Sequence, residues 1–363
     1  MKIKIFVDAH VFDGVHQGTT TYIKGIYTAL VANEAFEITL AANNIDHLRS
    51  QFNDDRFKYI KLPTSSKFKR LIYDIPRIIT DNRYDYAHFQ YIVPLIKSCK
   101  YINTIHDLLF LDFPKLFPFS YRFTKKYLFN FSAKRSDIIC TVSDYSKNAL
   151  IKYFKIHEGK IVITPNAVQL ARVPPIDIRS KYNINNYILF VSRFEPRKNH
   201  YAIIKAFVEL ELYKIKELVF IGRRQDVNTQ KFNDFYDTLV EDVKSKIIFL
   251  EGISNDELNN FYRQADLFIF PAFAEGFGIP PLEAAVNSCK VLCSNTTAMK
   301  DFDFFGKYQF NPEDIEELKS KMLKVLNDGS YPFGAVKEAI LKKYNWNIIA
   351  ERFGEEIIQD FSR

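Results

Sequence analysis

Short apolar runs alternate with longer amphipathic stretches along the first half of the chain. The amphipathic stretches predict helices at Thr19–Asn33, Tyr121–Ser136 and Ser143–Phe154, the last with Ser143 as its N-cap. Strands that alternate with helices predict a parallel sheet covered by helices on both faces. The apolar runs predict these strands at Ile3–Val7, Glu37–Ala41, Phe57–Ile60, Tyr86–Phe89, Tyr101–His106, Ile138–Val142 and Ile161–Thr164.

The alternation weakens near Ala167–Asn186, where Pro174 and Pro175 precede a polar run that is typical of a linker. It then resumes, and the two series together predict two Rossmann-like α/β domains that face each other across a cleft. A final amphipathic stretch predicts a helix at Trp346–Phe361. Further strands are predicted at Ile188–Val191, Leu218–Ile221, Lys246–Leu250, Asp266–Phe270 and Val291–Ser294, and helices at His200–Leu212, Asn255–Gln264 and Asp314–Asp328.

Length and composition agree with this organisation. The 363 residues suffice for about two domains. No run of about 18 apolar residues occurs, so we expect no transmembrane helix, and the first eight residues resemble a strand rather than a signal peptide. The four cysteines show no metal-ligand spacing, and we expect them to pack as small apolar residues in a reducing cytosol.

Basic residues concentrate in the first half of the chain. Residues 1–175 contain 25 Lys and Arg against 15 Asp and Glu, whereas residues 176–363 contain 25 against 28. This asymmetry favours an anionic partner for the first half, either lipid headgroups or nucleic acid. A purely solubilising charge is an equally good interpretation.

Residues 275–283, EGFGIPPLE, carry the most informative chemistry. They follow the strand predicted at Asp266–Phe270 and precede an apolar helix beginning near Pro281. A glycine loop before a helix presents backbone N–H groups to an anion, and the helix dipole adds positive charge. Glu275 at the loop and Glu283 in the first helical turn accept hydrogen bonds only, which suits a ligand rich in hydroxyls. A sugar nucleotide combines both features.

These residues resemble the retaining glycosyltransferases of family GT4, which have the GT-B fold. The Glu-x7-Glu motif from Glu275 to Glu283 carries the resemblance most strongly. It is joined, in the family's order, by the segments Thr104-Ile105-His106-Asp107-Leu108, Val142-Ser143-Asp144-Tyr145-Ser146, Pro165-Asn166-Ala167-Val168, Phe190–Asn199 and Asn295-Thr296-Thr297.

The resemblance implies domains at residues 1–170 (acceptor-binding) and 187–344 (donor-binding), a linker at 171–186, and a helix at 345–363 that crosses back to the first domain. It implies catalysis without an essential metal. The catalytic residues that it implies are His106, Glu275, Arg193 and Lys198. The donor-binding residues that it implies are Gly18, Thr19, Arg193, Lys198, Gly276, Phe277, Gly278, Ile279 and Glu283.

Each assignment has a plainer alternative. Arg193 and Lys198 would otherwise be exposed loop charges, and His106 would otherwise be a hydrogen-bonded core histidine. Glu283 would otherwise only complement the helix dipole. The chain also departs from the family at Gln17-Gly18-Thr19-Thr20-Thr21, where the usual glycine-rich loop loses one glycine and its arginine. Ser288 and Lys290 replace a glycine and a proline after the motif.

Aromatic residues interleave with basic ones between Phe110 and Arg135. This pattern fits an interfacial patch that meets a lipid-linked acceptor. It equally fits a buried helix face with a solvated opposite side. The Lys67–Arg70 segment has the same two interpretations.

The resemblance implies a cytoplasmic glycosyltransferase, peripheral at the inner face of the membrane, that uses a nucleotide sugar and a lipid-linked saccharide. The Glu-Pro-Arg-Lys-Asn segment and the residues after His106 look most like family members that use GDP-mannose in O-antigen or polysaccharide synthesis. UDP- and dTDP-sugars are alternative donors. The rival functions are a non-catalytic sugar-nucleotide-binding protein, a GT-B epimerase or phosphorylase, and a nucleic-acid-binding protein, of which we expect the last least.

Overall fold

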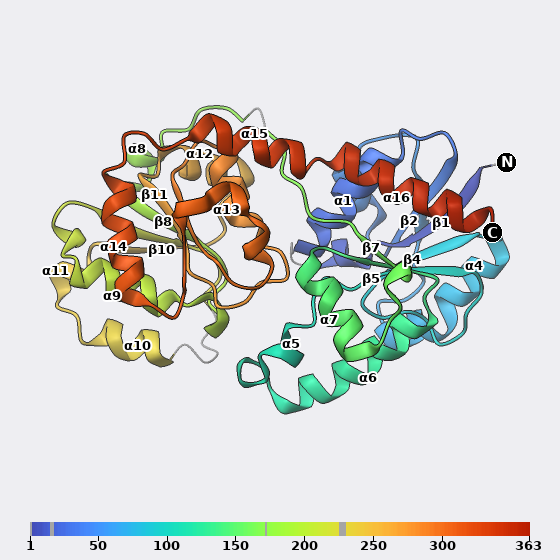
Figure 1. The fold of residues 1–363 in the computed structure, drawn as a ribbon. Coiled ribbons are helices and arrows are strands. Elements are labelled where there is room, and N and C mark those ends of the chain that lie inside the picture. The colour runs from blue at the N-terminus through green and yellow to red at the C-terminus, as the bar shows by residue number, and fades with distance from the viewer. Residues whose placement is uncertain (1, 15–17, 171–172, 225–229) are drawn as a thin grey trace. The chain divides into compact units, whose positions relative to one another are not determined.

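The computed structural model of the chain describes residues 2–14, 18–170, 173–224 and 230–363. By their contacts these residues form two compact units (Figure 1). Unit 1 combines Met1–Ala167 with Tyr344–Arg363, and unit 2 is Val168–Lys343. Ala171 and Arg172, at the start of the predicted linker, lie outside the described residues.

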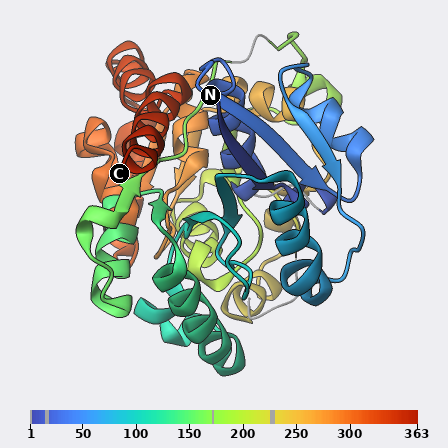
Figure 2. The ribbon, with the colours of Figure 1, turned by 90° about the vertical axis from the view of Figure 1, so that its right-hand side faces the viewer.

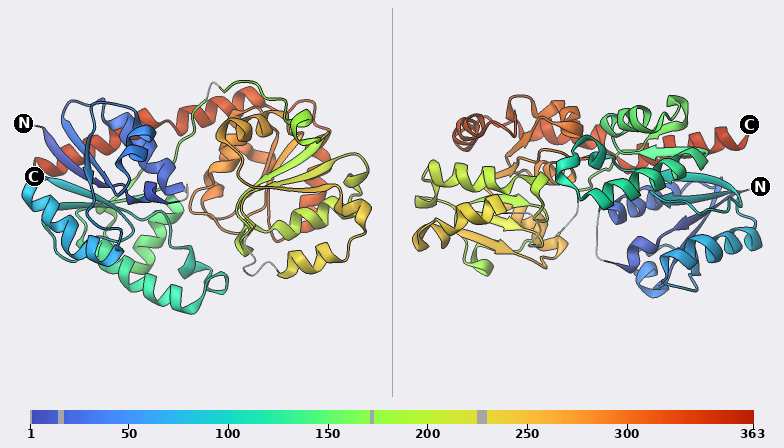
Figure 3. Two further views of the ribbon diagram at one scale, coloured as in Figure 1. Left: turned by 180° about the vertical axis from the view of Figure 1, so that it is seen from behind. Right: turned by 90° about the horizontal axis from the view of Figure 1, so that it is seen from below.

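The described part of unit 1 holds a parallel sheet of seven strands in the order β3-β2-β1-β4-β5-β6-β7. Every residue of β4 and β6 is buried, as expected for strands of a parallel sheet that is covered on both faces (Figures 2 and 3). The strands are β1 (Ile3–Asp8), β2 (Phe36–Ala42), β3 (Lys58–Lys61), β4 (Tyr86–Gln90), β5 (Lys100–Thr104), β6 (Ile138–Thr141) and β7 (Ile161–Ile163).

The helices of unit 1 begin at local signals in the sequence. Ser143 caps α7, since its side chain accepts a hydrogen bond from the Ser146 N–H (3.2 Å), which confirms that prediction. Helix α6 begins two residues earlier than predicted, directly after Pro118, which stands at its N-cap. The helices are α1 (Gly18–Leu30), α2 (Ile45–Phe52), α3 (Lys67–Lys69), α4 (Ile75–Asn82), α5 (Leu109–Asp112), α6 (Phe119–Arg135), α7 (Asp144–Phe154) and α16 (Trp346–Phe361), and a π-helical turn η2 (Arg70–Asp74) joins α3 to α4.

Helix α16 returns to unit 1 and packs on α1 (Figure 1). Gly25 of α1 makes this close approach possible, because a Cβ there would overlap the ring of Trp346. At the other end of α16, the Asp360 carboxylate accepts from Lys100 Nζ (2.9 Å) and from the hydroxyl of Tyr86 (2.6 Å). The predicted return of the last helix to the first part of the chain is therefore confirmed.

In unit 2 the described residues form a parallel sheet of six strands in the order β10-β9-β8-β11-β12-β13. The two-residue strand β13 was not predicted, because so short a segment carries no periodic signal. The two parallel sheets confirm the predicted α/β class. The strands are β8 (Tyr187–Val191), β9 (Glu217–Ile221), β10 (Ile247–Leu250), β11 (Leu267–Phe270), β12 (Val291–Ser294) and β13 (Gln309–Phe310).

Helix ends in unit 2 follow backbone geometry that the periodicity did not show. Helix α9 ends at Glu209 rather than Leu212, because Glu211 adopts a left-handed conformation (φ 52°). Within the predicted linker, α8 packs against α12. The helices are α8 (Ile178–Tyr182), α9 (His200–Glu209), α10 (Gln230–Asp237), α11 (Glu241–Lys244), α12 (Asn255–Gln264), α13 (Ile279–Val286), α14 (Ile315–Leu326) and α15 (Phe333–Lys343).

Candidate functional site

The order of the strands in unit 2 reverses between β8 and β11. In open α/β sheets, ligands bind beyond the carboxyl ends of the strands at such a reversal. Residues 192–199 follow β8 and residues 271–278 follow β11, so the predicted residues Arg193, Lys198 and Glu275 all lie in the two loops that flank this point. Gly222 permits the first loop to pass close to the end of β9, because a Cβ at its φ of 141° would overlap the carbonyl of Ser192.

A buried ion cluster joins these two loops. One carboxylate oxygen of Glu275 accepts a hydrogen bond from Lys198 Nζ, and the other lies 2.9 Å from Arg197 Nη1. Glu275 and Lys198 are each only 8% exposed. The Glu275 backbone N–H also donates to the hydroxyl of Thr297 (2.9 Å). The cluster therefore holds two cations and one anion on a rigid, largely dehydrated platform.

The charges of the cluster determine how its groups titrate. Burial by itself raises the pKa of Glu275, but the charges of Arg197 and Lys198 outweigh burial, so this pKa lies below its ordinary value. Burial lowers the pKa of Lys198, and the adjacent carboxylate opposes that shift. Because both cations stabilise its ionised form, Glu275 is a carboxylate and a weak base.

Arg193 does not belong to this cluster. Its side chain is 55% exposed and lies 3.0 Å from Glu195. Arg197 takes the place beside Glu275 instead, and its Nε lies 2.8 Å from Glu195 as well. The sequence offered one signal for Arg197, namely that it directly precedes Lys198 in a tight turn after Pro196.

The loop before α13 has the glycine geometry that the sequence predicted. Gly278 stands at the N-cap with φ 100°, a conformation that strongly favours glycine. Helix α13 begins at Ile279, and its second and third residues are Pro280 and Pro281. Since proline has no N–H, the donors at the tip of this helix come from Gly278 and Ile279 rather than from a full helical turn. Phe277 is buried (6% exposed), and its ring contacts that of Phe302.

Glu283 lies in the second turn of α13, not the first as predicted, because the helix starts two residues before Pro281. The carboxylate is half-buried and accepts a hydrogen bond from the hydroxyl of Tyr262 (3.0 Å). Burial raises the pKa of Glu283, and the hydrogen bond from Tyr262 partly offsets this rise. A group this far along the helix complements its dipole only weakly.

His106 lies in unit 1, two residues beyond the end of β5. Its Nε2 lies 2.6 Å from Gln90 Oε1, and its ring contacts the rings of Tyr22 and Tyr91. Burial lowers the pKa of His106 to about 3, so the imidazole is neutral at physiological pH. His88, which sequence reasoning missed, lies in the same polar network through Gln90, whose Nε2 is 3.4 Å from His88 Nε2, and it also contacts Thr104 Oγ1 (2.7 Å).

Gly18 and Thr19 are the first residues of α1. Gly18 is exposed, and a Cβ there would meet no atom within 4 Å. Gln17, the first residue of the predicted loop motif, lies outside the described residues. The predicted site residues thus form two sets, with Gly18, Thr19 and His106 in unit 1 and the others in unit 2.

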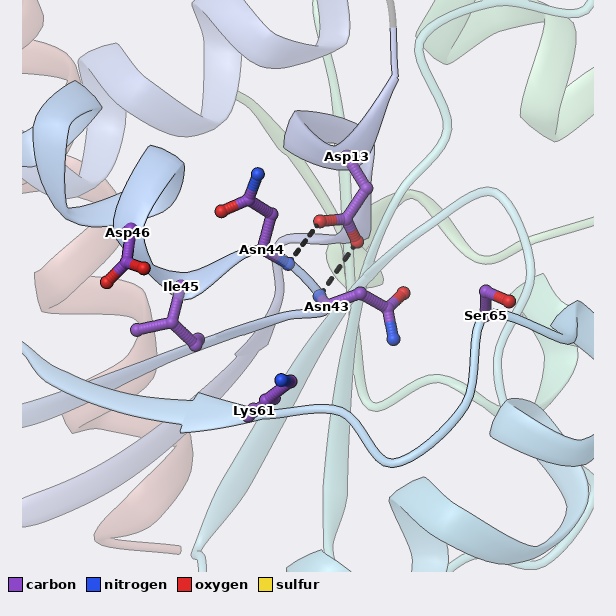
Figure 4. A pocket seen from close by; sticks show the side chains of 7 residues that line it. All are labelled: Asp13, Asn43, Asn44, Ile45, Asp46, Lys61 and Ser65. Carbon is purple, nitrogen blue, oxygen red and sulfur yellow. Dashed lines mark hydrogen bonds between the residues drawn. The ribbon is translucent and has the colours of Figure 1, made fainter.

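A polar cavity of about 660 Å³ lies beyond the carboxyl ends of β2 and β3 in unit 1 (Figure 4). Asp13 organises it, because its carboxylate accepts from the backbone N–H groups of Asn43 (2.9 Å) and Asn44 (2.8 Å). Amide, carboxylate and amino groups on its walls can all bond hydroxyls. The remaining lining residues are Ile45, Asp46, Lys61 and Ser65.

Two further properties of the described residues concern metal ions and membranes. Within residues 2–14, 18–170, 173–224 and 230–363, no group of three or more His, Cys, Asp or Glu side chains is placed to hold a metal ion. No helix among those residues is long and apolar enough to cross a bilayer.

Comparison with solved structures defines the class of protein first. The sucrose-phosphate synthase of Thermosynechococcus elongatus matches over 100% of both chains with a TM-score of 0.77 at 16% identity. HepE of Anabaena, solved with UDP-glucose, matches 99% of this chain and 100% of its own with a TM-score of 0.73 at 14% identity. At these identities the likeness concerns the fold alone, and that fold is GT-B.

Sequence comparison then gives the family. The model described as Glycosyltransferase Family 4 matches residues 16–172, and the model described as Glycosyl transferases group 1 matches residues 176–342. The two models together cover nearly the whole chain, which belongs to glycosyltransferase family 4.

Three curated relatives are similar to large parts of the chain. O-antigen chain mannosyltransferase B of Escherichia coli is 28% identical over 68% of this chain and 66% of its own length. O-antigen chain mannosyltransferase RfbU of Salmonella typhimurium is 27% identical over 64% of this chain and 62% of its own. The match thus spans less than two thirds of these mannosyltransferases. A UDP-Gal:alpha-D-GlcNAc-diphosphoundecaprenol alpha-1,3-galactosyltransferase of E. coli is 24% identical over 82% of both chains.

Proposed function

We propose that the chain transfers a mannosyl unit from GDP-mannose to a lipid-linked saccharide, with retention of the anomeric configuration. The product would be part of a cell-surface polysaccharide such as an O-antigen. The buried cluster of Glu275, Lys198 and Arg197, at the strand-order reversal of unit 2, is the observation that carries this proposal.

The cluster supplies what the departure of a diphosphate requires. Lys198 and Arg197 provide positive charge that is already oriented, so the developing phosphate charge needs little reorganisation. Each Glu275 oxygen holds one cation and keeps a lone pair for a sugar hydroxyl. The N–H groups of Gly278 and Ile279 add donors for a phosphate or sugar oxygen, as predicted for this loop. We propose that Glu283 accepts from the ribose hydroxyls, with Tyr262 holding its carboxylate.

Retention by transfer on the front face of the sugar agrees with these charges. Glu275 is neutralised by two cations, which makes it a poor nucleophile and a poor base. The leaving phosphate would then accept the proton of the acceptor hydroxyl. His106 is neutral, so we propose that it orients a hydroxyl and does not balance the phosphate charge. Arg193, exposed in the same loop, would reach the outer part of the donor.

The names of the relatives support mannose as the sugar and an O-antigen as the setting. The galactosyltransferase relative favours the alternative of a UDP-sugar, and dTDP-sugars are a further alternative. The acceptor saccharide is proposed to enter the polar cavity beside Asp13, whose walls suit hydroxyls. The scheme contains no metal: the net positive charge of the cluster, Arg193 and the N–H groups of Gly278 and Ile279 together would offset part of the charge of the diphosphate.

We further propose that the chain works at the cytoplasmic face of the membrane. The basic first half of the chain favours an anionic surface over a neutral one. A nucleic acid would also attract such charge, and a steep salt dependence of oligonucleotide binding would reveal that rival.

The test is calorimetric titration of the protein with GDP, UDP and dTDP, with Glu283→Gln as the matched variant. We expect GDP to bind most tightly and Glu283→Gln to weaken it at least tenfold, because a ribose acceptor is lost. Donor hydrolysis should follow the same order. If UDP binds most tightly, the donor is a UDP-sugar instead of GDP-mannose. Binding without hydrolysis or transfer would favour a non-catalytic protein. No binding of any of the three nucleotides would refute the proposal.

A further inference from the structure

An apolar groove in unit 1 is lined by none of the candidate site residues described above. Three segments form it, namely α3 with the following turn η2, the loop after β4, and the second half of α6. Its volume is about 540 Å³, within the usual range of sites for one small ligand. The lining residues are Lys67, Phe68, Leu71, Ile72, Ile92, Val93, Leu95, Leu128, Phe131 and Ser132.

The surface around the groove is unusually apolar. Among the described residues, eighteen large hydrophobic side chains are exposed, and ten of them lie in the short stretches 64–73, 91–98 and 117–136. Phe68 at the groove is 76% exposed and Leu95 is 58% exposed. Along α6, Phe119, Phe123 and Tyr127 form one solvent-facing stripe of contacting rings. The alternative of a buried aromatic face therefore does not account for this helix, and so large an exposed patch indicates an interaction site.

The stretches 64–73, 91–98 and 117–136 contain no acidic residue, and Asp74 at the end of η2 and Asp137 after α6 directly follow two of them. The three stretches contain nine Lys and Arg. Arg70 turns inward to Asp8 (3.8 Å), and Lys97 pairs with Asp137 (2.8 Å). The other seven form no ion pair with any residue that the structure describes, and they are Lys67, Lys69, Arg122, Lys125, Lys126, Lys134 and Arg135. The surface is therefore complementary to an apolar group that carries negative charge.

Two of these cations lie on the segments that form the groove. Lys67 is part of its lining, and Lys125 lies over the rings of Tyr121 and Phe129 on α6. Burial lowers the pKa of Lys125, and the charge of Lys67 lowers it further. The two charges repel each other, and no ion pair with a described carboxylate offsets this repulsion, so a bound anion would stabilise both side chains.

We propose that this groove binds the hydrocarbon chain of the lipid-linked acceptor, while Lys67 and Lys125 bind the phosphate next to that chain. This assignment rests on the proposed function and names a part of the acceptor that it left open. The ligand class is a single long hydrocarbon chain ending in a phosphate or diphosphate. An apolar groove of this volume accommodates one chain, and Lys67 in its lining together with Lys125 on α6 suits a phosphate as point charges.

The first experiment measures binding directly and needs no activity. Calorimetry with dodecyl phosphate below its micelle concentration is compared with butyl phosphate, which has the same head and little chain. We expect dodecyl phosphate to bind at least thirtyfold more tightly. Leu128→Asp, at a 40% exposed position of the groove, should weaken the binding of dodecyl phosphate at least tenfold. The combination of Lys67→Glu with Lys125→Glu should weaken this binding by at least the same factor. Ile215→Asp and Lys342→Glu, exposed positions of unit 2, should leave it unchanged.

The second experiment identifies the source of the lipid. Saccharide diphosphates with a long and a short alkyl chain are compared as acceptors in detergent, together with binding to vesicles containing anionic lipid. We expect Leu128→Asp to raise KM at least tenfold for the long-chain acceptor and not for the short-chain one, with GDP binding unchanged. Equal effects on both acceptors, or loss of vesicle binding alone, would overturn the proposal. Absence of transfer to either acceptor by the unaltered protein would instead count against the proposed function.

Discussion

Replacing Glu275 with Gln removes the only negative charge from the buried cluster while keeping the shape of the side chain. Lys198 is then a buried cation whose hydrogen-bond partner carries no charge, whereas Arg197 still has Glu195 at 2.8 Å. The perturbation therefore falls mainly on Lys198, which is 8% exposed.

The expected loss of stability follows from this geometry. Breaking a buried ion pair by removing one partner costs about 3–5 kcal/mol, because the other charge stays buried without compensation. We expect Glu275→Gln to lower the free energy of unfolding of unit 2 by about 3 kcal/mol. Lys198→Met alone leaves Glu275 with Arg197 and should cost less, about 2 kcal/mol. The double variant removes both charges and should lie within about 1–2 kcal/mol of the unaltered protein.

Urea denaturation of all four proteins at pH 7, followed by far-UV circular dichroism, completes a double-mutant cycle. Trp346 is the single tryptophan and lies in unit 1, so its fluorescence reports on that unit separately. The refuting result is clear: if the effects of the two single changes add to within about 0.5 kcal/mol in the double variant, the two charges are not coupled.

Three further predictions concern packing and pH. Gly25→Ala should lower stability by about 1–3 kcal/mol and shift the Trp346 fluorescence transition, because the added methyl overlaps that ring. Tyr262→Phe removes the hydrogen bond that lowers the pKa of Glu283, so this pKa should rise and the loss of GDP affinity on acidification should begin at a higher pH than in the unaltered protein. The pKa of His106 is about 3 in the folded protein, below its value in the unfolded chain. The contribution of His106 to stability is therefore complete above about pH 6.5 and is lost as the pH falls toward 3. His106→Gln should reduce the loss of stability between pH 6.5 and 4.5 by up to about 2.7 kcal/mol.

Controls keep these outcomes interpretable. Gly334→Ala, where a Cβ meets no neighbour, should not shift the tryptophan transition, and an equal shift in both glycine variants would contradict the packing argument. Tyr182→Phe removes a hydroxyl that contacts Glu257 instead of Glu283 and should leave GDP affinity unchanged. An unchanged pH slope in His106→Gln would mean that this histidine titrates normally in the folded chain.

Much of the fold and part of the candidate site followed from local patterns. Buried parallel strands have continuous apolar runs, and caps such as Ser143 act within one turn, so both can be recognised in sequence. Short or irregular elements were missed. Strand β13 is too short to show a periodic pattern, and the prolines at the start of α13 hide where that helix begins. The aromatic and basic stretch of α6 was ambiguous, since periodicity cannot distinguish an exposed apolar face from a buried one.

The sequence by itself determined the α/β class, the alternation of elements and the presence of the Glu-x7-Glu motif. Only the tertiary structure decided which charges meet. The side chain that joins Lys198 at Glu275 is Arg197 rather than Arg193, because the packed turn Pro196–Lys198 directs Arg197 inward, whereas Arg193 lies before that turn and is exposed beside Glu195. The apolar groove was equally a tertiary result. Its three walls are separated in sequence, and a cavity exists only where folding brings such segments side by side without filling the space between them.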